Sequence, residues 1–443
     1  MNAIRSLFWF AVLLGSTAML AAQQGSETLP APGGLPAQTY SLDDLIQIAL
    51  KQHPVLSQAQ FEIEAAQGRA LQAGKYPNPT LTIGGEEVGP RGGIHTLPLI
   101  SQEIVTAKKL QWARAVAERE LDQTFLALVS TRFGLITEVR RGFFEVLATQ
   151  RRRDALQARV KEVTKTLEQA KKLLKVLPEE GAEVVPLAFQ YELDRIGLEL
   201  TTSQREYVAA WNRLAATAGV PSLAIPASVA DPWLDRLPGF AVDPEPLKSQ
   251  QQLARLRDQI VQTHPAVRIA QVGIAKAEAT LGRERAQAVP NVTLAGGYQR
   301  NLNDREHQAI YQVGVPLPIF NRNQGNIRAA QAELGRAVAE VSRVQIDLSN
   351  RLASAYGQFA TAKLRAEQFD SLRKTTKKLY EATKTAYFTG GKLSNLQVIQ
   401  AQRQMIDADL EFTRAWGEAW KAASDIAGLI LDEDWPGLGN RKE

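Results

Sequence analysis

The chain has 443 residues, no cysteine and a formal net charge of +5, with 52 Lys and Arg against 47 Asp and Glu. The lack of cysteine excludes disulfide staples and a lipid attached to an N-terminal cysteine. The charge is modest and both signs are interleaved, which excludes the clustered basic surface of a nucleic-acid-binding protein, so we expect no nucleic-acid partner.

Residues 1–22 have the pattern of a secretory signal peptide, with a buried N-terminal helix as the alternative. Arg5 supplies a positive charge, an apolar run extends from Leu7 to Leu20, and small residues surround the expected cleavage near Ala22. Residues 23–40 are rich in Pro and Gly and are expected to be extended. The remaining chain has no apolar run of about 18 residues, so insertion into a membrane would require a β-barrel.

The rest of the chain is a duplicated unit. Residues 77–81 read Pro-Asn-Pro-Thr-Leu, and residues 290–294 read Pro-Asn-Val-Thr-Leu. Each copy follows a helical segment and precedes a Gly-Gly pair and a strand-like run. A repeat at this separation indicates two copies of one structural unit. The candidate residues for the crossings from helix to strand are Pro77, Asn78, Pro290 and Asn291.

Each repeat is expected to contain a strand pair followed by a helical hairpin. Repeat 1 is expected at 41–220, with strands at about 79–104 and a hairpin at about 105–219. Repeat 2 is expected at 251–431, with strands at about 291–318 and a hairpin at about 321–430. A Pro-rich equatorial connector at 221–250 separates the repeats, and a C-terminal tail occupies 432–443. Ser41 is the expected cap of the first helix.

Four histidines invite a metal interpretation, which the sequence disfavours. His53 and His264 each precede a proline, and proline suits the first turn of a helix. His95 and His307 stand alone near the strand pairs. No phosphate loop or dinucleotide fingerprint is present. We therefore expect no metal site, no cofactor and no enzymatic activity.

The helix after each strand pair is unusually long. No proline lies between Pro98 and Pro178, or between Pro318 and Pro436. A helix of roughly 70 residues would extend about 100 Å, and apolar residues recur at heptad spacing in the second one, as in a coiled coil. Four strands per chain leave two open sheet edges, so closing the sheet requires several chains.

The duplicated layout, the run Val-Pro-Leu-Pro-Ile-Phe-Asn-Arg-Asn-Gln-Gly-Asn at 315–326 and the hairpin Tyr-Phe-Thr-Gly-Gly-Lys-Leu-Ser at 387–394 resemble the TolC-like outer-membrane factor family, and within it the heavy-metal, CzcC-like efflux branch. The resemblance covers essentially the whole mature chain. It implies a mainly α fold with a small β part, in which a homotrimer forms a 12-strand outer-membrane β-barrel continued by a periplasmic α-helical coiled-coil tunnel.

The resemblance also implies a function. The chain would be the outer-membrane exit duct of a tripartite efflux system, passively exporting heavy-metal cations handed over by a periplasmic adaptor protein and a proton-driven inner-membrane transporter of the RND type, with outer-membrane lipid around the barrel. The alternatives are the same duct for drugs, other organic compounds or secreted peptides, and a non-conducting periplasmic coiled-coil scaffold.

Candidate gate residues follow from the same resemblance. Relatives carry acidic rings just after the second hairpin, where this chain has Gln397 and Gln400, and Asp407 is a further candidate on the same helix. Amide rings would carry no charge, which suggests that selectivity lies upstream in the pump; alternatively both glutamines are ordinary polar helix positions. The expected hairpin tips for adaptor docking contain Glu180, Gly181, Gly390, Gly391, Lys392, Leu393 and Ser394.

Overall fold

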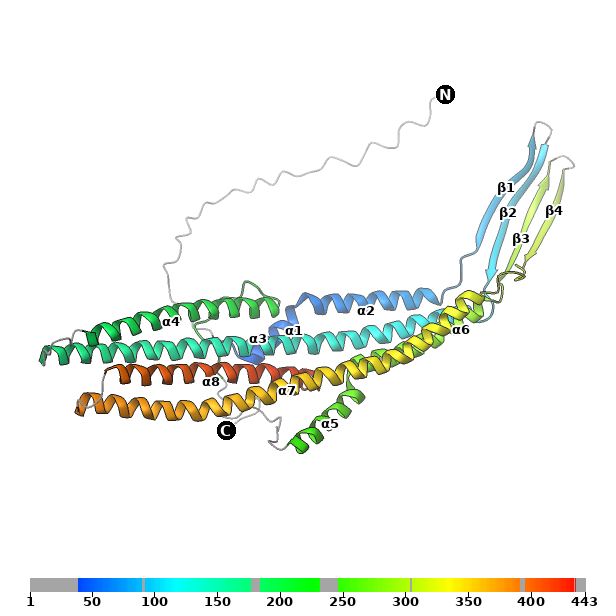
Figure 1. Ribbon diagram of the computed structural model, residues 1–443. Helices are drawn as coiled ribbons and strands as arrows, with labels where there is room; N and C mark the ends of the chain where they lie inside the picture. Colours follow the sequence, from blue (N-terminus) through cyan, green and yellow to red (C-terminus); the bar gives the residue numbers. More distant parts are fainter. Residues whose placement is uncertain are drawn as a thin grey trace, which may run out of the picture.

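The computed structural model describes residues 39–89, 92–176, 184–231, 246–302, 305–390, 395–433 and 435. Long helices lie side by side in an elongated bundle, and a small sheet projects from one end (Figure 1). The elements in chain order are α1 (Leu42–Gln52), α2 (Pro54–Ala73), β1 (Thr80–Gly89), β2 (Gly92–Ile104), α3 (Lys109–Val176), α4 (Val184–Thr217), α5 (Pro246–Thr263), α6 (Pro265–Gln287), β3 (Val292–Asn301), β4 (Glu306–Gly314), α7 (Gln324–Gly390) and α8 (Asn395–Leu429).

This order is one pattern written twice: two short helices, two strands, a long helix and a return helix. It confirms the predicted mainly α fold with a small β part. Helix α5 begins at Pro246, inside the segment for which the sequence predicted only a connector. Strand β4 ends at Gly314, short of the predicted boundary, because Pro316 and Pro318 have no N–H to donate to a ladder.

The first helix begins where its capping residues predict. The backbone N–H of Asp44 donates to Ser41 Oγ at 3.2 Å, and the N–H of Ser41 donates to Asp44 Oδ2 at 2.9 Å, which completes a capping box. The hydrogen bonds from Ser41 hold the pKa of Asp44 below its usual value.

Two of the isolated histidines are helix caps. His53 Nδ1 accepts from the backbone N–H of Val55 at 3.2 Å, and His264 Nδ1 accepts from that of Ala266 at 3.1 Å. The imidazole thus takes the place that Ser or Asp holds at most helix starts. The repeated His-Pro pair is a helix-start signal, with the histidine as cap and the proline as first residue.

The described strands form one antiparallel sheet in the order β1-β2-β3-β4. Leu81 lies opposite Ile100, which lies opposite Gly296, which lies opposite Tyr311. Gly297 has no room for a side chain, because a Cβ there would lie 2.8 Å from the carbonyl oxygen of Pro98. The outer edges of β1 and β4 have no partner strand within the described chain.

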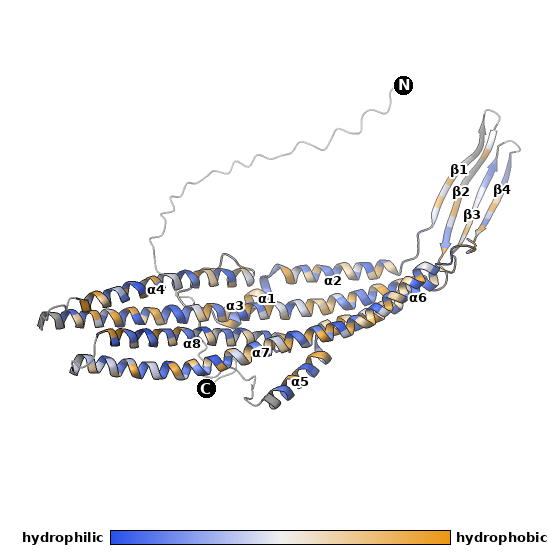
Figure 2. Ribbon diagram, in the orientation of Figure 1, coloured by the Kyte–Doolittle hydropathy of each residue, from blue (hydrophilic) through white to orange (hydrophobic). Residues whose placement is uncertain are grey.

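The four long helices form a layer in the order α4, α3, α8, α7 (Figure 1). Polar and apolar residues alternate along each of them (Figure 2). The aromatic centre of the core lies mid-way along the layer, where Trp420 stacks on Phe144 with ring centroids 4.4 Å apart. None of the described helices combines the length and hydrophobicity needed to cross a membrane.

The two faces of this layer differ. One face, the covered face, carries α1, the segment 219–231 and the chain after α8. There Gln150 and Arg151 of α3 bind Val229 and Asp231. The opposite face of α3 and α8, the bare face, has no such covering in the part of the chain that the structure describes.

The chain after α8 is held by one buried guanidinium. Arg140, fully buried, donates from Nη1 to the carbonyl of Asp432 at 2.8 Å and from Nη2 to that of Glu433 at 2.6 Å. Trp435 then packs against Phe144 and Trp420. The end of the second repeat is thereby fastened to the long helix of the first.

We predict that Arg140→Leu lowers the free energy of unfolding by about 3 kcal/mol, because two partly buried carbonyls lose charged donors from a fully buried guanidinium. Chemical denaturation of the purified protein measures this. The matched control is Arg132→Leu, whose exposed ion pair with Glu433 spans 3.4 Å and whose loss should cost less than about 1 kcal/mol. Equal effects of the two substitutions would contradict the assignment.

Candidate functional site

The crossing into β3 is tied to the chain leaving β2. Thr106 Oγ1 donates to the carbonyl of Pro290 at 2.6 Å, and its N–H donates to Asn291 Oδ1 at 3.2 Å. Lys109 Nζ donates to the same oxygen, and Asn291 Nδ2 donates to Glu103 at 2.7 Å. We call these contacts the repeat clasp, because they join the two repeats where helix becomes strand.

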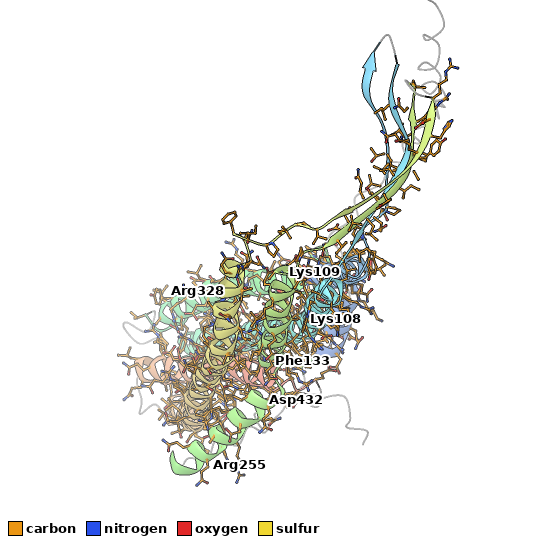
Figure 3. The ribbon with its side chains drawn as sticks, turned by 90° about the vertical axis from the view of Figure 1, so that its right-hand side faces the viewer. Lys108, Lys109, Phe133, Arg255, Arg328 and Asp432 are labelled. Carbon is orange, nitrogen blue, oxygen red and sulfur yellow. The ribbon has the colours of Figure 1, made fainter. Side chains whose placement is uncertain are left out.

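The clasp fixes an unusual backbone. Ala107 and Lys108 have φ angles of 55° and 57°, a left-handed conformation that residues other than glycine seldom adopt. Lys108 and Lys109 lie at the base of the strands (Figure 3). Local strain of this kind persists only where surrounding contacts determine it, and the bonds of Thr106 and Lys109 to Asn291 supply those contacts.

The corresponding crossing into β1 is held less completely. Gln102 Nε2 donates to the carbonyl of Pro77 at 3.0 Å. The side chain of Asn78, the counterpart of Asn291, is exposed and forms no hydrogen bond with any described residue. The structure therefore places the four predicted crossing residues at the base of the sheet, where both proline carbonyls accept a hydrogen bond but, of the two asparagines, Asn291 is bonded and partly buried and Asn78 is exposed.

The sheet has one apolar and one mainly polar face. Because partners across a ladder share a face, the register places the following large exposed residues together: Leu81, Ile100, Ile104, Leu294, Tyr298, Tyr311 and Val313. The opposite face contains Thr80, Ser101, Glu103, Thr293, Gln299, Gln308 and Gln312. The apolar face is uncovered by any described element.

The predicted gate residues lie on one stripe of α8. Gln397, Gln400 and Asp407 are exposed, and residues at alternating spacings of three and four continue the row towards the middle of the molecule. We define the polar stripe as Gln397, Gln400, Gln404, Asp407, Glu411, Arg414, Glu418, Lys421 and Asp425. The sequence analysis named three of these nine; the unbroken polar spacing was the signal for the rest.

The stripe belongs to the bare face. Lys421 Nζ lies 3.2 Å from Glu145 of α3, and Arg213 of α4 binds the other oxygen of that carboxylate at 2.5 Å. Burial alone would raise the pKa of Glu145, but the two cations lower it below its usual value. This face of the layer therefore carries paired charged groups where α3, α4 and α8 meet.

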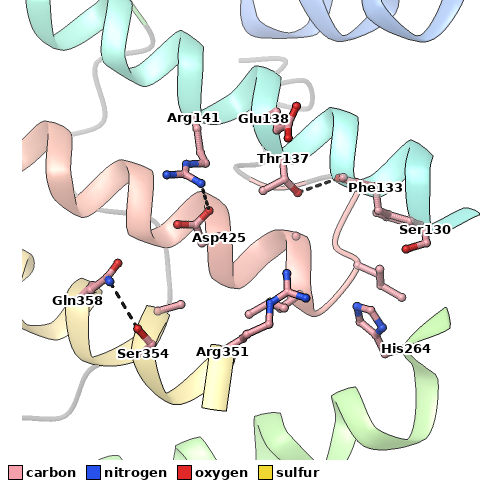
Figure 4. A pocket seen from close by; sticks show the side chains of 15 residues that line it. Ser130, Phe133, Thr137, Glu138, Arg141, His264, Arg351, Ser354, Gln358 and Asp425 are labelled. Atoms are coloured by element: carbon pink, nitrogen blue, oxygen red, sulfur yellow. Dashed lines mark hydrogen bonds and ion pairs between the residues drawn. The ribbon is translucent and has the colours of Figure 1, made fainter. Parts of the chain in front are cut away.

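A hollow of about 530 Å³ lies on this face, between α3, α7 and α8 (Figure 4). Asp425 meets Arg141 at 3.5 Å, and Arg351 and His264 line the other side. Burial raises the pKa of Asp425 against the effect of Arg141 and Arg351. Burial, with Arg351 nearby, lowers the pKa of His264.

Asp409 does not join the stripe. Its carboxylate accepts from Arg159 of α3 at 2.5 Å, which ties α8 to α3. Glu192 of α4, fully buried, accepts from Arg195 at 2.6 Å and from Arg403 of α8 at 2.9 Å. Two ionic ties therefore hold the hairpin half of α8 against the helices of the first repeat.

The hairpin tips are largely outside the described residues. Glu180, Gly181, Gly391, Lys392, Leu393 and Ser394 are not described, and Gly390 is the last residue of α7. Among the described residues, no group of three or more His, Asp or Glu is arranged to hold a metal ion.

The model of the outer membrane efflux protein family matches residues 45–220 and 256–429, one match in each repeat. The chain belongs to the outer membrane efflux protein family. This efflux protein is a transport protein of the outer membrane and not an enzyme. The two matched segments coincide with the two copies of the helix, strand-pair and hairpin unit.

The efflux protein is 26% identical over 430 residues to the cobalt-zinc-cadmium resistance protein CzcC of Cupriavidus metallidurans, covering 95% of this chain and 97% of that one. Its fold is similar to a membrane protein from Pseudomonas aeruginosa, with a TM-score of 0.71, 17% identity and coverage of 91% and 99%. CusC, solved in a study of transmembrane channel formation, gives a TM-score of 0.71, 14% identity and coverage of 91% and 97%.

We predict that Arg403→Gln in this efflux protein loosens the hairpin half of α8 by about 1–3 kcal/mol, because buried Glu192 loses a charged donor. Hydrogen exchange of residues 395–410 measures this. Arg414→Gln is the matched control: its side chain is 72% exposed, so its loss should cost less than about 1 kcal/mol. Unchanged exchange in Arg403→Gln would contradict the role of the tie.

The same tie has a definite pH dependence. Burial would raise the pKa of Glu192, but the hydrogen bonds from Arg195 and Arg403 outweigh it and lower the pKa. Its contribution is thus present above the unfolded carboxyl pKa and is lost as the pH falls through the lower, folded value. We expect exchange in α8 to rise only at acidic pH in the native chain, and at a higher pH in Arg403→Gln.

Proposed function

We propose that this efflux protein is the outer-membrane exit duct of a tripartite efflux system, and that it exports heavy-metal cations passively. Three copies would close their sheets into a 12-strand barrel, with the long helices forming a periplasmic tunnel. The similarity to CzcC, which extends over nearly the full length of both chains, is the observation that carries the choice of cargo.

The open edges of the chain support a ring of copies. Within the described residues, β1 and β4 each have an unpaired edge, and an unpaired strand edge can pair with another strand. The helical layer is open in the same way. When the repeats are aligned on their Ala-Thr pairs at 148 and 360, Leu379 of α7 corresponds to Leu167 of α3. Leu167 is buried, whereas Leu379 is 48% exposed.

That correspondence suggests which helix covers α7. Leu167 of α3 lies in a buried cluster with Val398 and Met405 of α8, the return helix of the other repeat. By repeat symmetry, Leu379 would meet a return helix of a neighbouring copy, which is α4. The apolar face of the sheet would then face lipid, since outward apolar residues are what a barrel in a bilayer requires.

The bare face supports a lumen. In a tube built from such layers, additional elements pack outside, so the covered face would be external and the polar stripe internal. From the hairpin inward the stripe offers three amides, Gln397, Gln400 and Gln404, before the carboxylates of Asp407 and Glu411. Three copies would therefore place a neutral ring at the mouth and acidic rings behind it, which favour cations.

The partners follow from the same proposal. A passive duct needs a pump, and we assign that role to a proton-driven inner-membrane transporter joined by a periplasmic adaptor. The adaptor would dock at the hairpin tips, around residues 180–181 and 390–394. The described ends of α3 and α7 that precede these residues lie at the opposite end of the helices from the sheet (Figure 1), which suits contact deep in the periplasm.

Sensitivity of a deletion strain tests the cargo. Loss of the gene should sensitise cells to divalent heavy metals and leave drug sensitivity unchanged, and the native gene should restore resistance. Sensitivity to drugs alone would reject the metal assignment and favour the organic-compound duct. Absence of conductance from the purified protein in planar bilayers would reject the duct itself.

We predict that Asp407→Asn combined with Glu411→Gln lowers the cation selectivity of the channel, because the first charged rings of the stripe become neutral. Reversal potentials in planar bilayers under a salt gradient measure this. Asp407→Glu, which keeps the charge, is the matched control and should retain selectivity. Equal reversal potentials in the neutral and native proteins would show that these carboxylates do not face the conducting path.

A further inference from the structure

The crossing from helix into β3 is held by hydrogen bonds within the same chain, and the corresponding crossing into β1 lacks most of them in the part of the chain that the structure describes. At Pro290 and Asn291 the repeat clasp supplies four hydrogen bonds from Thr106, Lys109 and Asn291 itself. At Asn78 no described residue takes the place of Thr106 or Lys109. Apart from the hydrogen bond from Gln102 to Pro77, the first crossing therefore lacks, among the described residues, the contacts that hold the second.

The missing half has a counterpart at the other end of the sheet. Thr106 stands eight residues before the pair Arg114-Ala115, and Phe320 stands eight residues before Arg328-Ala329. By this spacing Phe320 stands in repeat 2 at the place of Thr106, within one residue of the register given by the two helix starts, Lys109 and Gln324. It is 89% exposed, and Leu317 and Ile319 beside it are 76% and 61% exposed.

We propose that residues 315–320 of one copy dock on the crossing at Tyr76–Asn78 of the next copy and complete it. This inference rests on the proposed ring of three copies and specifies one contact between neighbouring copies in it. Strand β2 pairs with β3, which brings Thr106 to Asn291. If β4 pairs with β1 of the next copy in the same way, Phe320 is brought to Asn78.

The chemistry of this contact differs from that of the repeat clasp. Phe320 replaces a hydroxyl donor by an aromatic ring, and Tyr76, 66% exposed, precedes Pro77 as Val289 precedes Pro290. A proline ring flanked by tyrosine offers an apolar surface for phenylalanine. The contact between copies is therefore apolar, whereas the contact between repeats is hydrogen-bonded and charged.

A second observation points to the same neighbour. Gly297 and Gly84 are repeat counterparts, each seven residues after the proline of its crossing. A Cβ at Gly297 would lie within 2.9 Å of Leu99 in β2, whereas a Cβ at Gly84 would meet nothing within 4 Å. The glycine at 84 is unnecessary for this chain alone, and a strand from the next copy explains it.

Disulfide trapping tests the proposal, because the native chain has no cysteine. Asn78→Cys and Phe320→Cys in one chain should, after oxidation in membranes, give dimers and trimers on non-reducing gels. Thr106→Cys with Asn291→Cys is the matched control, since Thr106 Oγ1 and Asn291 Oδ1 lie 3.4 Å apart; it should form a disulfide without any gain in mass.

The outcomes separate this proposal from the proposed function. Native channels that conduct, with an oxidised control but no linked copies of the Asn78 and Phe320 variant, would overturn the docking contact and leave the duct intact. Absence of any oligomer or conductance in the native protein would reject the duct as well. Asn78→Cys with Val338→Cys should give no linked species, because Val338 lies further along α7, away from the sheet.

Substitution of Gly84 provides an independent readout. Gly84→Val should leave a single folded chain, judged by helical content, but should reduce the fraction assembled into heat-sensitive oligomers. Gly68→Val in α2 is the control, because a Cβ there also meets nothing within 4 Å and the position is far from the sheet edge. Normal assembly of Gly84→Val would overturn the assignment of a strand to that edge.

Discussion

The hydrogen-bonding capacity of strand edges governs this architecture. Backbone N–H and C=O groups require partners wherever water is excluded. Among the strands that the structure describes, β1 and β4 each have a neighbour on one side only. The helical layer repeats the problem, with α4 and α7 at its two ends. The sheet and the helical layer are thus open at the same two sides of the chain, and a head-to-tail neighbour of the proposed ring would cover the sheet edge and the helix edge of one side together.

The crossings show how the chain changes from helix to strand without breaking its contacts. Pro290 cannot donate a backbone hydrogen bond, so it ends the helical pattern. Asn291 Oδ1 then accepts from the backbone N–H of Thr106 and from Lys109 Nζ. The left-handed residues Ala107 and Lys108 allow α3 to begin directly below the sheet. The hydrogen bonds of the Asn291 side chain therefore fix the change from helix to strand without a longer loop.

Much of this fold could be predicted from the sequence, because its signals are local or repeated. Ser41 followed by Asp44 specifies a helix start, and the absence of proline after Pro98 and after Pro318 permits two long helices. The role of His53 as a cap was missed, because histidine has no strong preference for that place and only the bond to Val55 reveals it.

The candidate site was harder to predict, because it depends on which residues meet. Asp407 and Asp409 are two residues apart on one helix, so helical spacing places them on different sides of it but does not show which side another helix contacts. The structure separates them: Asp409 binds Arg159 of α3, and Asp407 remains on the polar stripe. Ties between helices that are more than 200 residues apart in the chain leave no local pattern, as for Glu192 and Arg403.

The two return helices, α4 and α8, carry different kinds of residue at matching positions of the two repeats. Counting back from the Ala-Gly pairs that follow each helix, at 218 and 427, Tyr191 and Leu198 of α4 correspond to Gln400 and Asp407 of α8. The first pair is apolar and 65% and 70% exposed, while the second is polar. If both helices carried carboxylates, a ring of three copies would hold twice as many like charges at one level, and their repulsion would oppose closure. Confining the carboxylates of this level to α8 gives the proposed duct a negative charge there and leaves the corresponding positions of α4, Tyr191 and Leu198, uncharged.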